Sequence, residues 1–286
     1  MGKPLFQDLI AQGPLFIPRW RSYLGRLEQR PTREIFENPV RLCMSLRRTQ
    51  QLFALNAICI DLSTEQIICS NPLKMTEPRG DFEVMLEAYR GLSRIIEPAV
   101  GLFGYIPGPG NLSRAIVRPA SLTEAAWCER CRDTVLSLIR HLGETNIFTA
   151  VLINESMIDT TEFSAGHFRS LRAIFNLLAF YELAVLLISQ APPDEGAGPS
   201  GLEELNPTAV VFQSDRATLP KNPAFTGFTG RALSPELLAS GNDVVLRTIS
   251  DMLEHEVAII TTAGEIPPTI EPRTIHDLSR LINDYS

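Results

Sequence analysis

Charged residues follow several short apolar runs of the sequence, and they are the first candidates for chemistry. Asp61 lies at the end of the run 57–62, and Arg19 and Arg21 follow the run 15–17. A carboxylate accepts hydrogen bonds or acts as an acid or base, and two arginines at this spacing would clamp an anion with their planar N–H forks. Two alternatives stay open: Asp61 as a helix cap, and the arginines as a solvated basic turn.

A cluster of acids follows the apolar run 149–153. Its members are Glu155, Asp159 and Glu162. Carboxylate oxygens are suitable ligands for Mg²⁺, so the cluster is one candidate for a magnesium site. The other interpretation places these acids at the N-terminus of the helix beginning near Ala165, where negative charge stabilises the helix dipole. We therefore predict no obligatory cofactor and keep Mg²⁺ as an option.

Soft metal ligands and histidine bases are poorly placed. Cys128 and Cys131 form a single Cys-x-x-Cys pair inside a predicted helix, and one pair cannot complete a tetrahedral zinc site. We predict ordinary helix cysteines. The four histidines fall within or at the ends of predicted helices, so none is placed as a general base at a strand end.

The elements that must position these residues alternate between short β-branched runs and longer amphipathic stretches. Eight candidate strands cover residues 15–17, 57–62, 100–105, 149–153, 183–188, 208–212, 224–227 and 257–261. The main candidate helices cover about 32–55, 81–96, 121–142, 165–180 and 274–284, with Ser121 as the predicted N-cap of the third. Continuous apolar strands alternating with helices indicate a parallel sheet buried on both faces. We predict an α/β fold, a (β/α)₈ TIM-type barrel forming a single domain over 1–286.

Composition excludes several classes of partner. The formal net charge of −7 argues against a general binder of nucleic acid or of anionic membranes. The most apolar window, 177–188, is too short to span a bilayer. Five cysteines are an odd number for a disulfide framework, so we expect a reducing, cytoplasmic setting.

The segment 260–275 carries the most specific motif. Its sequence is Ile-Thr-Thr-Ala-Gly-Glu-Ile-Pro-Pro-Thr-Ile-Glu-Pro-Arg-Thr-Ile, a last strand followed by a small-residue turn and a closing helix. This arrangement resembles the C-terminus of the uroporphyrinogen decarboxylase superfamily, which includes the cobalamin-linked methyltransferases. The strand ending in Asp61, the turn at 104–112, the triplet 154–156 and the segment 225–238 are similar to further family motifs. The resemblance implies a (β/α)₈ barrel and a homodimer.

The resemblance also implies roles for individual residues. Asp61 matches a family aspartate that accepts N–H bonds from the substrate, and Ser156 matches a serine that orients a substrate carboxylate. The segment 18–24, with Arg19 and Arg21, is similar to the family segment whose arginines pair with substrate carboxylates, but does not reproduce it. The chain departs from the family after the third strand, where 112–116 lack a tyrosine, and after the eighth, where Glu265 is the nearest replacement for a missing histidine. It also lacks the methyltransferases' zinc-binding cysteine and His-x-Cys.

We therefore predict a divergent lyase, similar to the decarboxylase, that acts on an anionic small molecule in the barrel mouth. The catalytic candidates are Asp61 and Glu265, and the substrate-binding candidates are Arg19, Arg21, Tyr105 and Ser156. Tyr105 belongs to an aromatic group, with Phe16, Trp20 and Phe103, that would suit an apolar substrate, although such residues more often pack in a core or at its rim. The alternatives are a terpene-cyclase-like barrel of secondary metabolism using Mg²⁺ and an isoprenoid diphosphate, a methyltransferase-like enzyme without zinc, and a non-catalytic binding protein.

Overall fold

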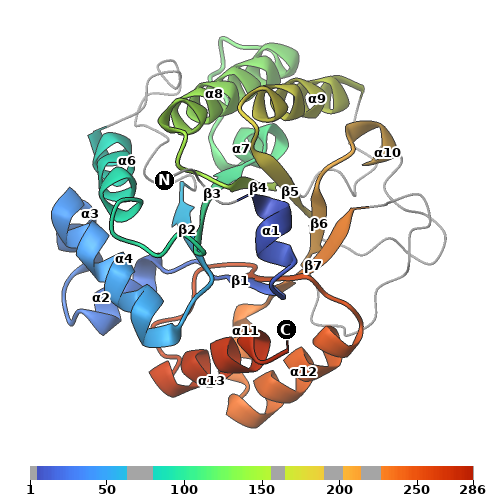
Figure 1. Ribbon diagram of the computed structural model, residues 1–286. Helices are drawn as coiled ribbons and strands as arrows, with labels where there is room; N and C mark the ends of the chain where they lie inside the picture. Colours follow the sequence, from blue (N-terminus) through green and yellow to red (C-terminus); the bar gives the residue numbers. More distant parts are fainter. Residues whose placement is uncertain (1–4, 63–79, 156–164, 190–201, 214–226, 286) are drawn as a thin grey trace.

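Eight parallel strands form the centre of the molecule. The computed structural model describes residues 5–62, 80–155, 165–189, 202–213 and 227–285 (Figure 1). The strands are β1 (Leu15–Ile17), β2 (Ala57–Asp61), β3 (Gly101–Pro107), β4 (Ala150–Asn154), β5 (Ala184–Ser189), β6 (Ala209–Phe212), β7 (Phe228–Leu233) and β8 (Ile259–Thr262). Parallel ladders join them in the order β1-β8-β7-β6-β5-β4-β3-β2, which confirms the predicted barrel.

Helices surround the strands. They are α1 (Phe6–Ile10), α2 (Arg21–Leu27), α3 (Thr32–Phe36), α4 (Pro39–Phe53), α6 (Gly80–Leu92), α7 (Pro109–Ala115), α8 (Glu124–Thr145), α9 (Ala165–Phe180), α10 (Leu202–Leu205), α11 (Pro235–Ala239), α12 (Asn242–Glu254) and α13 (Pro272–Asn283). Alternate strand residues enter two separate apolar clusters, one inside the barrel and one between strands and helices. Both faces of the sheet are buried, which is why most strand residues are apolar.

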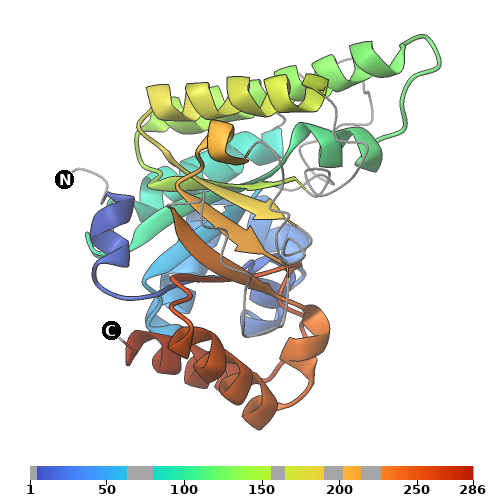
Figure 2. The same ribbon diagram turned by 90° about the vertical axis from the view of Figure 1, so that its right-hand side faces the viewer.

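The short helix α1 covers the amino end of the barrel (Figures 1 and 2). The Phe6 ring makes edge contacts with Phe103 and Phe228, with ring centroids 6.4 and 5.8 Å apart. Leu9 fills the space above Gly101, where a Cβ atom would lie 2.5 Å from the leucine Cδ1. Apolar side chains therefore close this end of the barrel.

The junction between β1 and β2 is built differently from the others. These strands lie side by side, but they are the two ends of the ladder order. The side chain of Asn56, just before β2, crosses the junction: its Oδ1 accepts from the Phe16 N–H at 3.3 Å and its Nδ2 donates to the Pro14 carbonyl at 3.0 Å. An amide side chain thus replaces a backbone ladder near the amino end of the seam.

Seven of the eight predicted strands match the structure to within two residues. The eighth strand, one helix and one helix N-cap differ from the prediction. The strand predicted at 224–227 lies at 228–233, and the described part of the earlier range, residue 227, precedes it. The helix predicted over 32–55 is divided into α3 and α4, because Asn38 caps α4 by accepting from the Arg41 N–H at 2.9 Å. The N-cap of α8 is Thr123 rather than Ser121, and its Oγ1 accepts from the Ala126 N–H.

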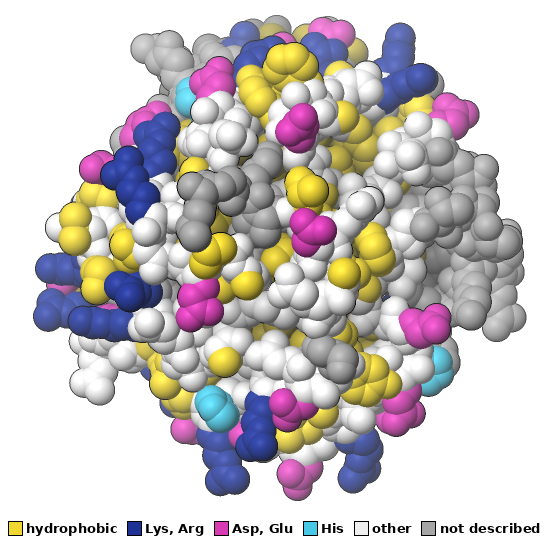
Figure 3. All heavy atoms as spheres, in the orientation of Figure 1, with side chains coloured by type: hydrophobic (Ala, Val, Ile, Leu, Met, Phe, Trp, Pro, Cys, Tyr) yellow, Lys and Arg dark blue, Asp and Glu magenta, His cyan; other side chains and the backbone are white. Residues whose placement is uncertain are grey.

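Arginines gather at one side of the molecule, over α2 to α4 at the left of Figure 3. Within 26–48 there are six arginines and three glutamates. Four of the arginines lie close to glutamates of this segment, as in the Arg41–Glu34 pair with 3.6 Å between Nη1 and Oε2 and the Arg30–Glu34 pair at 3.8 Å. Exposed pairs of this kind stabilise a fold by about 0.2–1 kcal/mol at most. Among the described residues, no helix has both the length and the apolarity needed to cross a bilayer.

Candidate functional site at the carboxyl end of the barrel

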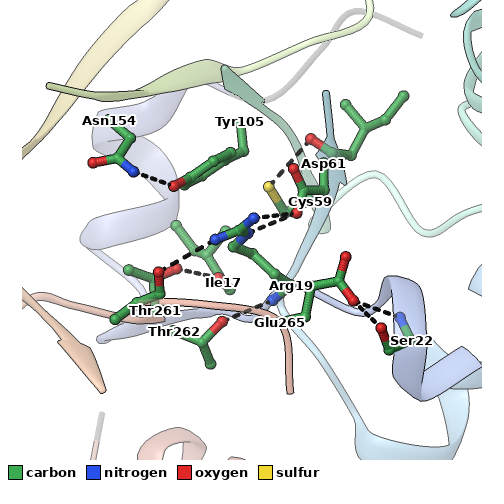
Figure 4. A network of polar contacts seen from close by, with 12 residues as sticks. Ile17, Arg19, Ser22, Cys59, Asp61, Tyr105, Asn154, Thr261, Thr262 and Glu265 are labelled. Carbon is green, nitrogen blue, oxygen red and sulfur yellow. Dashed lines mark hydrogen bonds and ion pairs between the residues drawn. The ribbon is translucent and has the colours of Figure 1, made fainter. Parts of the chain in front are cut away.

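A buried ion pair lies at the carboxyl ends of β1 and β2 (Figure 4). The Arg19 Nε and Nη2 atoms donate to Asp61 Oδ2 at 2.7 and 2.6 Å, and the two side chains are 10% and 4% exposed. Alternation explains the meeting, because Arg19 lies two residues after the interior residue Ile17, and Asp61 lies two after the interior residue Cys59. The sequence placed both residues at this end, and the structure brings them into direct contact.

Strand β8 fixes the start of the turn that carries Arg19. The Arg19 backbone N–H donates to Thr262 Oγ1 at 3.2 Å, and its Nη1 donates to the Ala263 carbonyl at 3.3 Å. The Thr261 hydroxyl donates to the Ile17 carbonyl at 2.6 Å. The guanidinium is therefore held from its backbone and from its tip, which lowers the entropy that it would lose on binding a ligand.

Tyr105 completes the charged group. It is the ladder partner of Asp61 on β3, and the Arg19 guanidinium carbon lies 4.0 Å from the centre of its ring. Burial raises the pKa of Tyr105 to about 12, against the opposing effect of the Arg19 charge. Burial alone would lower the pKa of Arg19, but Tyr105 and Asp61 raise it overall. At neutral pH the site therefore holds a guanidinium beside a protonated phenol.

Two amide side chains that the sequence analysis missed extend this group. Asn154 Nδ2 donates to the Tyr105 hydroxyl oxygen at 2.7 Å, and Gln213 Nε2 donates to Asn154 Oδ1 at 3.5 Å. Both residues lie at the carboxyl end of the alternating series of side chains that point into the barrel. Asn154, for example, follows the interior residue Leu152 by two positions. The same alternation that placed Asp61 inside the barrel would have identified Asn154.

Cys59 lies one interior position below Asp61. Burial raises its pKa well above the usual value, with a further contribution from the charge of Asp61. Its thiol therefore stays protonated at neutral pH, and a protonated thiol is a poor nucleophile. Cys59 forms part of the floor of the site.

Glu265 and Arg21 lie apart from this group. The Glu265 carboxylate is turned toward Ser22 at the start of α2, where it accepts from the Ser22 N–H at 3.0 Å and from its hydroxyl (Figure 4). The Arg21 guanidinium lies over the Phe36 ring, with 4.8 Å between its central carbon and the ring centre. The predicted clamp of two arginines is not formed, because Arg21 begins a helix that turns its side chain outward.

The predicted acidic cluster is described only at its first member. Glu155 is buried, and its Oε2 accepts from the Gly110 N–H at 2.7 Å at the start of α7. Ser156, Asp159 and Glu162 lie outside the described residues. Within the described ranges, no three His, Cys, Asp or Glu side chains come together as a metal site would require.

The Cys-x-x-Cys pair lies on α8, outside the barrel. Cys131 is buried in the outer core, and Cys128 Sγ lies 4.0 Å from His167 Nε2 on α9. Burial raises the pKa of both thiols, that of Cys131 to about 12. Raised pKa values agree with structural rather than reactive cysteines.

Comparisons with known proteins identify the fold alone. No protein-family model and no curated protein matches the sequence. Among solved structures, a methyltransferase from Methanosarcina mazei has a TM-score of 0.69 at 14% identity, and the match covers 96% of this chain and 92% of that one. A GH5_18 protein from Bifidobacterium longum subsp. infantis has a TM-score of 0.58 at 12% identity, covering 96% and 79%. A broad-specificity GH5-4 endoglucanase from an uncultured bacterium has a TM-score of 0.57 at 9% identity, covering 99% and 97%.

These structures differ in chemistry although they share the barrel. A function for this chain must therefore be argued from its own site. The chain folds as a TIM-type barrel, similar in architecture to several enzymes, with a buried polar group at the carboxyl end of its strands.

Proposed function

We propose that this chain is a lyase-type enzyme that binds a small carboxylate at the carboxyl end of its barrel. The observation that carries the proposal is the Arg19–Asp61 pair beneath Tyr105, a polar group buried where TIM-barrel enzymes build their active sites. Replacing a buried ion pair by apolar residues is often neutral or stabilising, so stability alone does not account for this one.

The lyase class requires two capacities that this group supplies. When a carboxylate leaves as CO₂, its C–C bond breaks, the electron pair stays on carbon, and that carbon then takes up a proton. Arg19 supplies a cation that attracts a carboxylate, and Asp61, which accepts from its Nε and Nη2 atoms, holds the guanidinium in place. Tyr105 carries a proton at neutral pH because burial raises its pKa to about 12.

Ligand-dependent stabilisation tests the proposal. Melting temperature would be measured with acetate, benzoate and a porphyrin octacarboxylate, and in parallel with benzamide, cobalamin, and farnesyl diphosphate with Mg²⁺. A ligand at about 100 times its Kd stabilises by roughly 2.7 kcal/mol, which is a shift of several degrees. We expect shifts with carboxylates and not with benzamide. A shift confined to the diphosphate with Mg²⁺ would replace the lyase by the diphosphate-dependent alternative.

Arg19 and Arg21, on either side of Trp20, form a matched pair for substitution. Arg19→Lys keeps a cation for Asp61 but removes the planar fork, whereas Arg21→Lys makes the same change outside the site. We expect Arg19→Lys to abolish the carboxylate shift and Arg21→Lys to retain it. Equal shifts in both variants would contradict the assignment of the site. Turnover of any ligand that binds, followed as CO₂ release, then separates an enzyme from a binding protein.

A further inference from the structure

The hydrogen bonds around Tyr105 all run in one direction. Gln213 Nε2 donates to Asn154 Oδ1, and Asn154 Nδ2 donates to the Tyr105 oxygen. The phenol is therefore an acceptor from the protein, and its own O–H proton points elsewhere. Among the residues that the structure describes, no acceptor for that proton is found. The Tyr105 side chain is nonetheless almost fully buried.

A buried hydroxyl without an acceptor is costly unless a ligand or water supplies one. The atom that would fit must be an acceptor, and it must tolerate the nearby guanidinium of Arg19, 4.0 Å from the ring centre. A carboxylate oxygen meets both conditions, because it accepts a hydrogen bond and its charge is attracted to the guanidinium, whereas an ammonium or an amide N–H is no acceptor. The chain of donors thus selects the chemistry of the ligand.

We propose that Tyr105 donates its hydroxyl proton in a hydrogen bond to a carboxylate oxygen of the substrate, and that Asn154 and Gln213 are positioning residues that set this direction. The inference rests on the proposed function for its ligand, but the direction of the hydrogen bonds is a property of the protein itself. A chain of hydrogen bonds polarises its members in the same sense, so the last donor is the strongest.

Substitutions that conserve shape but reverse the direction test this assignment. Asn154→Asp replaces the amide donor by a carboxylate that only accepts, so Tyr105 must donate to it and loses its proton for the ligand. Gln213→Glu acts one step further away: its carboxylate attracts Asn154 Nδ2, which turns Asn154 Oδ1 toward Tyr105. Tyr105→Phe removes the hydroxyl and keeps the ring over Arg19. Gln51→Glu, on the exposed face of α4, is the matched control for added charge.

The binding experiment measures Kd for benzoate and acetate by NMR in the full-length protein. We expect Tyr105→Phe, Asn154→Asp and Gln213→Glu each to weaken binding roughly ten- to a hundredfold, the value of a hydrogen bond to a charged group. Gln51→Glu should bind as the original chain does. If the original chain binds these carboxylates and the three variants bind equally well, the inference is overturned although the proposed function stands.

A second measurement needs no ligand and so separates the inference from the proposed function. The Raman spectrum of tyrosine contains a doublet whose intensity ratio distinguishes a phenol that accepts a hydrogen bond from one that donates. The difference between the spectra of the original chain and Tyr105→Phe isolates one tyrosine of five. We expect this signal to move to the donor ratio in Asn154→Asp and in Gln213→Glu. A signal at the donor ratio already in the original chain, or no change in either variant, would overturn the inference.

Discussion

Removing Arg19 should cost much more stability than removing Arg19 and Asp61 together. In Arg19→Met the Asp61 carboxylate keeps its burial, with 4% of the side chain exposed, but loses the two charged hydrogen bonds at 2.6 and 2.7 Å. Breaking a buried pair on one side costs about 3–5 kcal/mol, because the remaining charge is uncompensated. Loss of the contact with the Tyr105 ring adds to this, with about 2 kcal/mol as the upper range for a desolvated cation and ring.

The double variant Arg19→Met with Asp61→Leu leaves no buried charge. Apolar replacements of similar volume are often neutral or stabilising by 1–4 kcal/mol. We therefore expect the double variant to be at least about 2 kcal/mol more stable than the single one. At roughly 2–4 °C for each kcal/mol, the single variant should melt about 6–20 °C below the original chain.

Calorimetry and urea unfolding at pH 7 would measure both effects. Equal destabilisation in the single and double variants would refute the reasoning, because the cost would then come from lost packing around the arginine stem rather than from an unpaired carboxylate. If the double variant is stable as expected, it is also a folded protein without the charged site, and it is the appropriate inactive control for every binding assay proposed above.

Three further outcomes follow from the geometry. Asn56→Ala should lower stability by about 2 kcal/mol in urea unfolding, since two hydrogen bonds across the β1–β2 junction are lost; an unchanged midpoint would contradict the bridging role. Gly143→Ala should lower stability by about 1–3 kcal/mol, because a Cβ atom would lie 2.2 Å from the Tyr181 ring, whereas Gly91→Ala, with 3.3 Å to its nearest neighbour, should be nearly neutral or stabilising in the same thermal melts. The unfolded chain ionises Tyr105 near pH 10 and the folded chain near pH 12, so the unfolded state binds fewer protons in this window and stability should fall as pH rises through it, by up to roughly 2.7 kcal/mol. Tyr105→Phe should show a smaller decline, and an identical decline would place the titrating group elsewhere.

The fold could be predicted from the sequence because most strands are apolar on both faces and end near turn residues. β7 was misplaced because its signal is weak: it contains Gly230 and Arg231. A Cβ atom at Gly230 would lie 2.8 Å from the Ile259 carbonyl oxygen, so the neighbouring strands require glycine there. Arg231 is fully buried, and burial lowers its pKa to about 10. Tertiary contacts determine which residue fits at each of these two positions, and a local sequence pattern carries no information about such contacts.

The site could be predicted in its position but not in its connections. Asp61, Arg19 and Tyr105 were placed at strand ends, yet the sequence treated Arg19 and Asp61 as separate ligands for a substrate. Their pairing depends on the seam of the barrel, which joins residues 42 positions apart. Residue type alone points to the acid Glu155 rather than to the neighbouring amide Asn154. Alternation separates them, since Asn154 faces the interior and Glu155 faces α7.

The seam between β1 and β2 has a consequence for the protein's behaviour in a crowded solution. Side chains close this junction at both ends, Asn56 near the amino end and the Arg19–Asp61 pair at the carboxyl end. If these side-chain contacts break, the two strands expose unpaired backbone N–H and C=O groups, and such strand edges can pair with another copy of the chain. The Arg19–Asp61 pair therefore also protects the barrel against domain swapping and aggregation. A substitution of Arg19 that alters the chemistry of the site also weakens the β1–β2 junction, and this limits which residues the position can accept.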